Sequence, residues 1–258
     1  MQTYDSEFMA LALADAPIDP RTGNKVIYNA SWRATNDSMI GERNEDWVRR
    51  ELDWFALGSD LLADMEPPVP QAFQACAGHD GRVNSAYGHI LFDDSSAPSL
   101  YTRALNTFFE EGLMTRHSVA VITDRDVHNL ATYNGRHDFI CTNVLNFMVD
   151  HKNHLHIIAQ MRSMDAVWGY RADYSMWDYV MDKMVADMNS KMIKYWGEIT
   201  RGDISFQVAN LHVYPRHFDL LDRWAHKIYD DQERRMRRQW MERADRERLE
   251  AADRAAQN

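Results

Sequence analysis

The sequence has few cysteines, no long apolar run and no excess of positive charge. Its two cysteines, Cys76 and Cys141, are too few for a disulfide framework and are typical of a reducing compartment. No apolar run approaches the roughly 18 residues that a membrane span needs, and residues 1–7 contain no basic segment leading into a signal core. The net charge of −10 argues against a broad basic surface for nucleic acid. These absences predict a cytoplasmic protein that binds neither a membrane nor, directly, nucleic acid.

What the chain does contain is typical of a folded globular protein. Of its 258 residues, 45% are hydrophobic and 26% are charged, which is enough for one large domain with a full core. The last part differs, because charged side chains dominate it and apolar side chains are sparse. We therefore expect a main domain over residues 1–222 and a charged helical extension over residues 223–258.

The spacing of apolar residues predicts the elements of the main domain. Helices are expected over residues 7–15, 44–57 and 102–112, and a buried helix rich in methionine is expected to contain residues 177–188. Strands are expected over residues 118–123, 144–149, 155–161 and 204–209. Residues 84–88 are typical of a turn into a strand, and residues 124–136 are typical of a polar loop.

Two features of this pattern indicate chemistry. Glu51 lies four residues after Trp47 and four before Phe55, on the apolar stripe of its predicted helix. A carboxylate there is paired, protonated or hydrated within a cavity, unless it sits at the edge of the stripe and reaches water. The second feature is a cysteine, Cys141, at the head of a predicted strand, with Arg162 at the end of the next strand. A cation near a thiol would favour the thiolate, so Cys141 is a candidate nucleophile, and an inert buried thiol is the alternative for a lone cysteine.

Motifs in a fixed order carry a resemblance to a known family. They are residues 51–55 (ELDWF), 87–88 (YG), 141–143 (CTN), 162–165 (RSMD) with Gly169 and Asp173, and 211–214 (LHVY). Over about residues 15–222 the chain resembles the thymidylate synthase superfamily, and within it the phage-type deoxycytidylate hydroxymethylases. The resemblance implies an α/β (α+β) fold with a large, mixed, mostly antiparallel twisted sheet and packed helices. It also implies that residues 1–222 form the catalytic domain and that two copies form a homodimer, sheet against sheet.

The resemblance assigns the chemistry to Cys141, which would attack C6 of a pyrimidine nucleotide. The carbon C5 then takes a one-carbon unit from the co-substrate 5,10-methylenetetrahydrofolate, and no metal is expected. Glu51 matches the family glutamate that organises water and relays protons, so we predict a general acid and base. Thr142 stands where thymidylate synthases have a histidine, and no proton transfer is assigned to it. Cys76 is expected to be an inert thiol.

The resemblance also assigns the phosphate site. Arg21 on the first loop and Arg162 match two of the family's phosphate ligands. Arg116 matches the first of two arginines that the other subunit donates, whereas His117 stands at the second. The charge at that place therefore depends on pH.

Other residues match the family's nucleotide and folate contacts. His212 and Tyr214 match the pair that binds the sugar 3′-hydroxyl, and Ser163 matches a serine beside the phosphate and sugar. Asp165 matches an aspartate that contacts both base and folate. Tyr87 lines the same cavity, and Phe73 and Gly169 complete the expected folate site.

Two differences from thymidylate synthases predict the substrate and the product. Asp173 stands where those enzymes read uracil with an asparagine, and a carboxyl group suits the N4 amino group and N3 of cytosine. It could also cap the following helix. Asp138 and Phe73 stand where thymidylate synthases exclude water with leucine and tryptophan, and a carboxylate can hold a water molecule. Asp138 and Asp173 are therefore assigned to catalysis together with Cys141 and Glu51.

We therefore predict conversion of dCMP to 5-hydroxymethyl-dCMP in the cytoplasm, or in a host cytoplasm if the source is a phage. Methylation of dCMP and hydroxymethylation of dUMP or CMP are the alternatives. A homologue that binds nucleotide without catalysis belongs to a different class, and retention of Cys141, Arg162, Glu51 and Asp173 argues against it.

Overall fold

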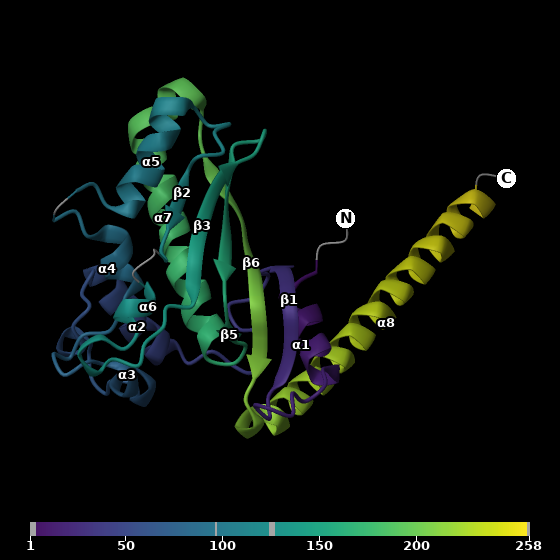
Figure 1. The fold of residues 1–258 in the computed structure, drawn as a ribbon. Helices are drawn as coiled ribbons and strands as arrows, with labels where there is room; N and C mark the ends of the chain where they lie inside the picture. The colour runs from purple at the N-terminus through teal and green to yellow at the C-terminus, as the bar shows by residue number, and fades with distance from the viewer. Residues whose placement is uncertain (1–3, 96, 124–126, 257–258) are drawn as a thin grey trace.

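The computed structural model describes residues 4–95, 97–123 and 127–256, which fold around one twisted sheet (Figure 1). The strands are β1 (Lys25–Arg33), β2 (Val119–Val121), β3 (Thr142–Val149), β4 (His154–Met161), β5 (Met164–Asp165) and β6 (Thr200–Val213). Their order is β1-β6-β4-β3-β2, with β5 paired to β6. The pairs β1·β6, β2·β3 and β3·β4 are antiparallel, and β4·β6 and β5·β6 are parallel. The predicted mixed sheet is therefore confirmed.

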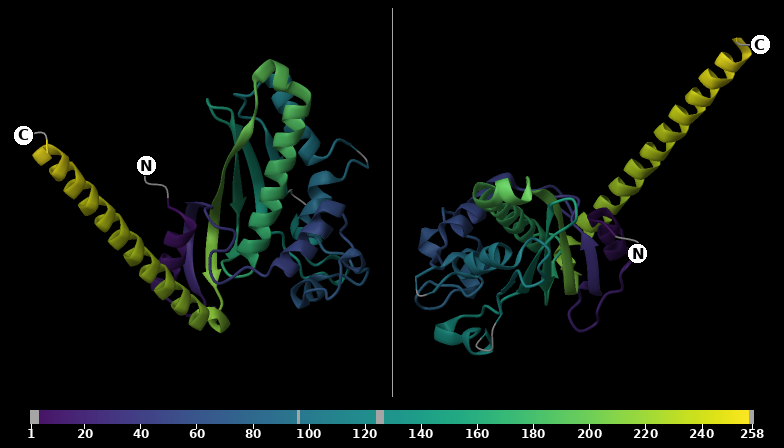
Figure 2. Two further views of the ribbon diagram at one scale, coloured as in Figure 1. Left: turned by 180° about the vertical axis from the view of Figure 1, so that it is seen from behind. Right: turned by 90° about the horizontal axis from the view of Figure 1, so that it is seen from above.

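The helices pack in two places (Figures 1 and 2). The α-helices are α1 (Ser6–Asp15), α2 (Glu45–Leu57), α3 (Gln71–Cys76), α4 (Tyr87–Phe92), α5 (Leu100–Glu111), α6 (Val127–Leu130), α7 (Gly169–Trp196) and α8 (Phe218–Ala256). Short 3₁₀ turns span Leu62–Asp64, Tyr133–Gly135 and Pro215–His217. The helices α2, α4, α5 and α7 lie together on one side of the sheet, and α7 runs along β4 and β6. In contrast, α1 and the first turns of α8 pack together at the β1 end.

The core lies between α7 and the sheet, as the methionine-rich stripe predicts. On α7, Trp177, Met181, Met184 and Met188 are fully buried. On the facing strands the alternate residues are buried, among them Leu145 and Phe147 of β3 and Leu155, Ile157 and Ala159 of β4. Each of the buried leucine, isoleucine, phenylalanine and methionine side chains contributes roughly 1.5–3 kcal/mol of burial free energy. This layer fixes the positions of both α7 and the strand ends.

Local signals explain the bounds of α2. The Asn44 side chain accepts a hydrogen bond from the Trp47 backbone N–H at 3.0 Å and caps the first turn. Gly58, with a φ of 70°, ends the helix in the left-handed conformation. Between these caps the buried residues Val48, Glu51 and Phe55 form one stripe. The prediction that Glu51 lies on the buried face is therefore confirmed.

The predicted strand after residues 84–88 is wrong, because these residues lead into helix α4. Tyr87 and Leu91 are buried at helical spacing. Gly88 lets the α4 backbone approach α2 so closely that a Cβ atom there would lie 1.9 Å from the Phe55 carbonyl oxygen. A close contact between two helices, and not a strand, explains this glycine.

Three other predictions need correction. Residues 124–136 were expected to form a loop, and they contain α6 and a 3₁₀ turn; residues 124–126 lie outside the described residues. The strand β6 is longer than residues 204–209, because its pairing with β1 and β4 extends in both directions. Asp173 does not cap the methionine-rich helix, because α7 already begins at Gly169.

The charged extension is a single long helix that leaves the body of the protein (Figure 2). Leu221, Ala225 and Ile228 are buried near its start, whereas Met236 and Trp240 are exposed. The helix begins at Phe218, a few residues before the predicted boundary at residue 223, and the division into two domains stays a prediction. Within the described residues no helix is both long and apolar enough to cross a membrane.

Candidate active site

A cavity of ≈ 400 Å³ opens at the end of the sheet where β3 begins and β4 and β6 end. Its volume is typical of a site for a small ligand. Of the fourteen residues that the sequence assigns to the site, twelve line this cavity. They are Glu51, Phe73, Tyr87, Asp138, Cys141, Arg162, Ser163, Asp165, Gly169, Asp173, His212 and Tyr214. The fold thus brings together residues that are spread over most of the chain.

Cys141 lies immediately before β3, and hydrogen bonds to its backbone hold it in place. The Tyr87 hydroxyl accepts hydrogen bonds from the backbone N–H groups of Cys141 and Thr142, at 3.1 and 3.0 Å. Burial raises the pKa of the Cys141 thiol to about 11, although the charge of Arg162 acts in the opposite direction. The thiol is therefore protonated at neutral pH in this state, and its attack on a substrate requires loss of that proton.

Arg162 is held against the segment that leads to Cys141. Its Nε atom donates a hydrogen bond to the Ile140 carbonyl at 2.9 Å, and an Nη atom donates to the Phe139 carbonyl. The guanidinium carbon also lies 4.8 Å from the centroid of the Phe139 ring. These contacts fix a permanent positive charge in the wall of the cavity, beside the thiol.

Two buried carboxyl groups face the cavity from neighbouring helices. Glu51 on α2 is 6% exposed and Asp173 on α7 is 9% exposed. Burial raises the pKa of Glu51 to about 7, although a hydrogen bond from the Trp47 indole, at 2.9 Å, lowers it. Burial raises the pKa of Asp173 well above its ordinary value, and the charges of Glu51 and Asp165 raise it further. Near neutral pH this pair therefore holds protons that it can donate.

Asp138 is buried in the wall of the same cavity. Its Oδ2 atom accepts hydrogen bonds from the Ser85 backbone N–H, at 2.7 Å, and from the Ser85 hydroxyl, at 2.9 Å. Within the described residues, Oδ2 accepts both of the hydrogen bonds made to this carboxylate, and Oδ1 accepts none. The Oδ1 atom is left for a ligand or a water molecule.

The downstream residues come from the adjacent strands β5 and β6. Asp165 pairs in register with His212. His212 Nδ1 lies 3.0 Å from the Asn210 side-chain oxygen, and its ring stacks edge-on against Tyr214 with centroids 4.9 Å apart. Burial lowers the pKa of His212, so the ring is neutral at neutral pH. A neutral ring whose Nδ1–H donates to Asn210 presents Nε2 as an acceptor, which suits a hydroxyl donor.

The two remaining predicted residues do not line the cavity. The Arg21 side chain is 79% exposed, and it pairs with Asp19 at 3.0 Å and with the Tyr28 hydroxyl at 3.3 Å. Arg116 is exposed in the segment before β2. His117, next to it, lies 2.8 Å from a carboxylate oxygen of Glu111. In this single chain, therefore, neither arginine lines the cavity that contains Arg162.

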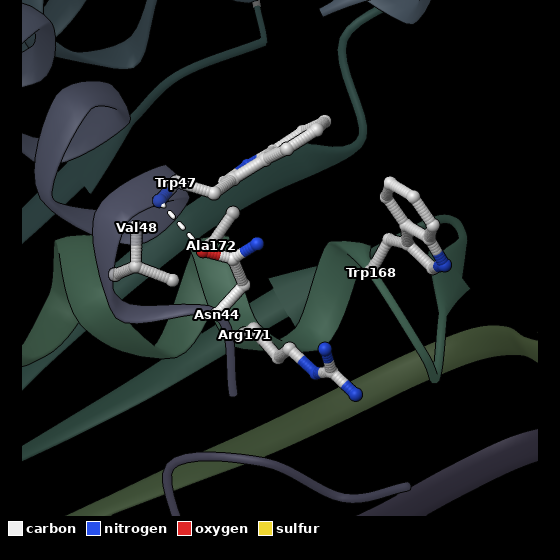
Figure 3. A pocket seen from close by; sticks show the side chains of 6 residues that line it. All are labelled: Asn44, Trp47, Val48, Trp168, Arg171 and Ala172. Atoms are coloured by element: carbon white, nitrogen blue, oxygen red, sulfur yellow. Dashed lines mark hydrogen bonds between the residues drawn. The ribbon is translucent and has the colours of Figure 1, made fainter. Parts of the chain in front are cut away.

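A second pocket that the sequence did not predict adjoins the first (Figure 3). It is lined by Asn44, Trp47, Val48, Trp168, Arg171 and Ala172, and Ala172 also lines the main cavity. The rings of Trp47 and Trp168 meet edge to face with centroids 5.2 Å apart. Two sequence signals could have indicated it, because Trp47 lies one helical turn before Glu51 and Trp168 immediately precedes Gly169.

A group of possible metal ligands lies at the opposite end of the sheet. Polar atoms of Asp150, His154 and His156 lie within 4.8 Å of one another. The Asp203 backbone N–H donates to Nδ1 of His156 at 2.9 Å, so the neutral ring carries its proton on Nε2, the atom that lies 3.5 Å from Asp150. Hydrogen bonding therefore explains this group, and no lone pair of His156 faces a metal.

The fold defines the class of the protein as thymidylate synthase-like. Thymidylate synthase A from Bacillus subtilis is 17% identical and matches with a TM-score of 0.59 over 78% of this chain and 70% of its own. Thymidylate synthase from phage T4 is 16% identical and also matches with a TM-score of 0.59, over 82% of this chain and 75% of its own. At this identity the likeness shows the fold alone.

The sequences of curated relatives then give the family. The chain is 32% identical to the deoxycytidylate 5-hydroxymethyltransferases of Enterobacteria phages T4, T2 and T6 over 228 residues, which cover 84% of this chain and 86% of each relative. No family model matches the chain. The protein belongs to the deoxycytidylate 5-hydroxymethyltransferase family, a group of one-carbon transferases. The predicted fold, family and enzyme class are confirmed.

Proposed function

We propose that the protein converts dCMP to 5-hydroxymethyl-dCMP with 5,10-methylenetetrahydrofolate and water. The observation that carries the proposal is the buried carboxyl of Asp173, which lines the same cavity as Cys141 and whose pKa burial raises well above its ordinary value. Within the described residues the Asp173 side chain takes part in no hydrogen bond, so the group is left for a ligand. The relatives named for action on deoxycytidylate support the same substrate.

Asp173 suits cytosine because of the chemistry of the two groups. A protonated carboxyl presents an O–H donor and a carbonyl acceptor side by side. Cytosine presents N3 as an acceptor beside the N4 amino donor, so two hydrogen bonds form together. When the ring is attacked at C6, N3 becomes more basic and takes the proton. The carboxylate that remains stays paired with the N4 amino group, whereas in uracil it would face O4.

The attack itself is assigned to Cys141. A bond forms between its sulfur and C6, the C5–C6 double bond opens, and the negative charge is taken up at N3 by the proton from Asp173. The proton of the thiol is transferred to the buried carboxyl pair, Glu51 and Asp173. It replaces the proton that Asp173 has donated to N3. Arg162 stabilises the developing thiolate from the wall of the cavity.

We assign the oxygen of the hydroxymethyl product to a water molecule that is hydrogen-bonded to Asp138. Methylenetetrahydrofolate, when bound, would supply a one-carbon unit to C5, and C5 would lose its proton as tetrahydrofolate leaves, which gives an exocyclic methylene group. Water then adds to this methylene carbon. The sulfur of Cys141 leaves C6, the C5–C6 double bond re-forms, and N3 returns its proton to Asp173. The free Oδ1 atom of Asp138 can accept a hydrogen bond from that water. Glu51, whose pKa is about 7, can hold or release a proton near the same place at neutral pH.

The second pocket is assigned to part of the folate. It adjoins the main cavity at Ala172, and Trp47, Trp168 and Arg171 line it (Figure 3). The Arg171 guanidinium donates hydrogen bonds to the Ser38 hydroxyl and the Ile40 carbonyl. The aromatic rings suit the flat aryl part of a folate, and the arginine suits its terminal carboxylate. Phe73, Tyr87, Asp165 and Gly169 would hold the end of the co-substrate that enters the main cavity.

The phosphate of dCMP is assigned to Arg162, Ser163 and, after movement of its loop, Arg21. His212 and Tyr214 are assigned to the sugar 3′-hydroxyl. Arg116 is exposed and does not line its own cavity, which supports a homodimer in which each copy donates Arg116 to the other.

Complementation between two inactive variants tests this sharing. Arg116→Ala and Cys141→Ala are each expected to be inactive as pure dimers. After mixing and subunit exchange, about a quarter of wild-type activity should return, because half of the dimers are mixed and each of these has one complete site. If the mixture stays inactive although mass spectrometry detects mixed dimers, Arg116 does not act across the interface.

One assay tests the reaction and its alternatives. The enzyme is incubated with dCMP, dUMP and CMP in separate reactions with methylenetetrahydrofolate, and the nucleotides are weighed by mass spectrometry. A gain of one formaldehyde unit on dCMP is expected, and a gain of one methylene unit would replace the proposal with methylation. Failure to release tritium from C5-labelled dCMP would indicate a homologue that binds nucleotide without catalysis.

A further inference from the structure

Glu51 depends on one neighbour for the orientation of its carboxyl group. In the part of the chain that the structure describes, its single hydrogen-bonding partner is the Trp47 indole, whose Nε1 atom lies 2.9 Å from Oε2. Trp47 and Glu51 are four residues apart on α2, so the helix itself aligns the two side chains. The orientation of the carboxyl is therefore set within one helix and does not depend on a bound ligand.

The chemistry of this hydrogen bond restricts the proton of Glu51. An indole N–H is only a donor. The Oε2 atom therefore accepts in both protonation states. A carbonyl oxygen is a better acceptor than a protonated oxygen, so a proton that Glu51 takes up is favoured on the other oxygen, Oε1. Without the indole this preference is lost, and the carboxyl could present its proton in either direction.

Trp47 is itself held firmly, which makes it a suitable anchor. Its backbone N–H is bound by the Asn44 side chain at 3.0 Å, and its ring packs edge-on against Trp168 with centroids 5.2 Å apart (Figure 3). The ring forms one wall of the second pocket, while its nitrogen faces Glu51 in the main cavity. The indole thus stands between the two pockets.

We propose that Trp47 is a positioning residue for Glu51 and that it favours the exchangeable proton of the carboxyl on Oε1. The proposal rests on the function proposed above, in which Glu51 transfers protons. The ionisable side chains that share the cavity with Glu51 are Asp173 on α7, Tyr87 on α4, Asp138 and Cys141 before β3, Arg162 and Asp165 near β5, and His212 and Tyr214 at the end of β6. Within the described residues, none of these side chains donates a hydrogen bond to Glu51, and the Trp47 indole is its donor.

The test removes the indole N–H and retains an aromatic ring. In Trp47→Phe the titration midpoint of Glu51 is expected to rise by about one pH unit, a tenfold increase in proton affinity, because the ionised carboxyl loses its donor. The midpoint is read from the ¹³C signal of the Glu51 carboxyl carbon in protein with labelled glutamate, and the signal is assigned by its absence in Glu51→Gln. The limb of the kcat/KM profile that reports on Glu51 should move in the same direction.

A matched control separates this role from packing. Trp54 lies on the same helix and is buried, and its indole N–H donates to the Leu61 carbonyl at 3.1 Å. Trp54→Phe deletes the same group, and it should lower stability without moving the Glu51 midpoint. An unchanged midpoint in Trp47→Phe, or an equal shift in Trp54→Phe, would overturn the proposal.

A second substitution at Trp47 and a measurement that does not depend on turnover keep the test decisive. If Trp47→Phe does not fold, incorporation of β-(3-benzothienyl)alanine at this position exchanges the N–H for sulfur and retains the bicyclic shape, with the same expected shift. The NMR midpoint needs no turnover. If wild-type protein makes no hydroxymethyl-dCMP but the midpoint still shifts, the proposed function fails while the hydrogen bond stands.

Discussion

Replacement of Glu51 by glutamine is expected to stabilise the protein and to abolish its turnover. Burial raises the pKa of this carboxyl from its ordinary value of 4.5 to about 7. Between these two values the native state binds a proton that the unfolded state has released. Stability therefore falls as pH rises through this window and stays low above it. Glutamine has a similar shape and no charge, so the variant escapes this penalty.

The size of the effect follows from the same two pKa values. Each pH unit over which the native state alone holds the proton contributes about 1.4 kcal/mol to the difference. The penalty on the wild-type protein is then about 2 kcal/mol at pH 6 and about 3 kcal/mol at pH 8. The free energy of unfolding of Glu51→Gln should exceed that of the wild type by similar amounts, and the excess should grow with pH.

Urea unfolding at pH 6 and pH 8, followed by both fluorescence and circular dichroism, measures this difference. Glu66→Gln is the matched control, because a hydrogen bond from Arg49 lowers the pKa of the exposed Glu66. Loss of that carboxylate should lower stability at both pH values. If Glu51→Gln is less stable than the wild type at pH 8, or if its excess stability is independent of pH, Glu51 is not a desolvated acid and the reasoning is refuted.

The same variant tests the catalytic role of Glu51. Loss of a general acid and base lowers kcat by roughly 10²–10⁴-fold, whereas dCMP should still bind, since Glu51 is not assigned to the phosphate or sugar. Equilibrium dialysis with labelled dCMP measures the binding. Turnover at the wild-type rate would exclude this role.

Three further variants have distinct expected results. Asp173→Asn should lose activity on dCMP and gain relative activity on dUMP, as measured by kcat/KM for both nucleotides; an unchanged preference would remove Asp173 from base recognition. Asp138→Leu should lower the yield of hydroxymethyl product relative to methyl product or uncoupled folate turnover, as weighed by mass spectrometry; an unchanged yield would exclude Asp138 as the water ligand. Trp240 is 71% exposed, so Trp240→Ala should change the free energy of unfolding by less than about 0.5 kcal/mol; a larger loss in urea unfolding would show that another surface covers this residue.

The elements that the sequence predicted well are those whose burial is periodic. The apolar stripe on α7 and the alternation of buried and exposed residues in β3 and β4 each depend on residues within one element. The spacing of these residues along the sequence is therefore enough to predict them. The helix α4 could not be predicted in this way. Its place in the fold depends on Gly88, which allows the backbone to approach the Phe55 carbonyl of α2 closely, and no local pattern reports a contact between helices.

The residues of the candidate site also divide into those that the sequence pattern predicts and those that it does not. Glu51 could be singled out from the sequence, because a carboxylate on an apolar stripe is unusual. Cys141 and Arg162 stood out as a candidate pair, and the remaining members of the cavity were found through the resemblance, since their positions along the chain give no physical reason for them to meet. The second pocket was missed because Trp47 lies on α2 and Trp168 immediately before α7, and a tryptophan on an apolar stripe is most simply a core residue.

The electrostatics of the cavity argue that the single chain is an incomplete site. Glu51, Asp138, Asp165 and Asp173 all line it, and among the lining residues that the structure describes Arg162 is the one side chain with a permanent positive charge. A nucleotide phosphate would add negative charge beside these carboxyls. Protonation of the buried pair reduces the repulsion but supplies no cation. Further positive charge is therefore expected at the phosphate when the nucleotide binds, and Arg21 or, in the homodimer proposed above, Arg116 of the second copy would supply it.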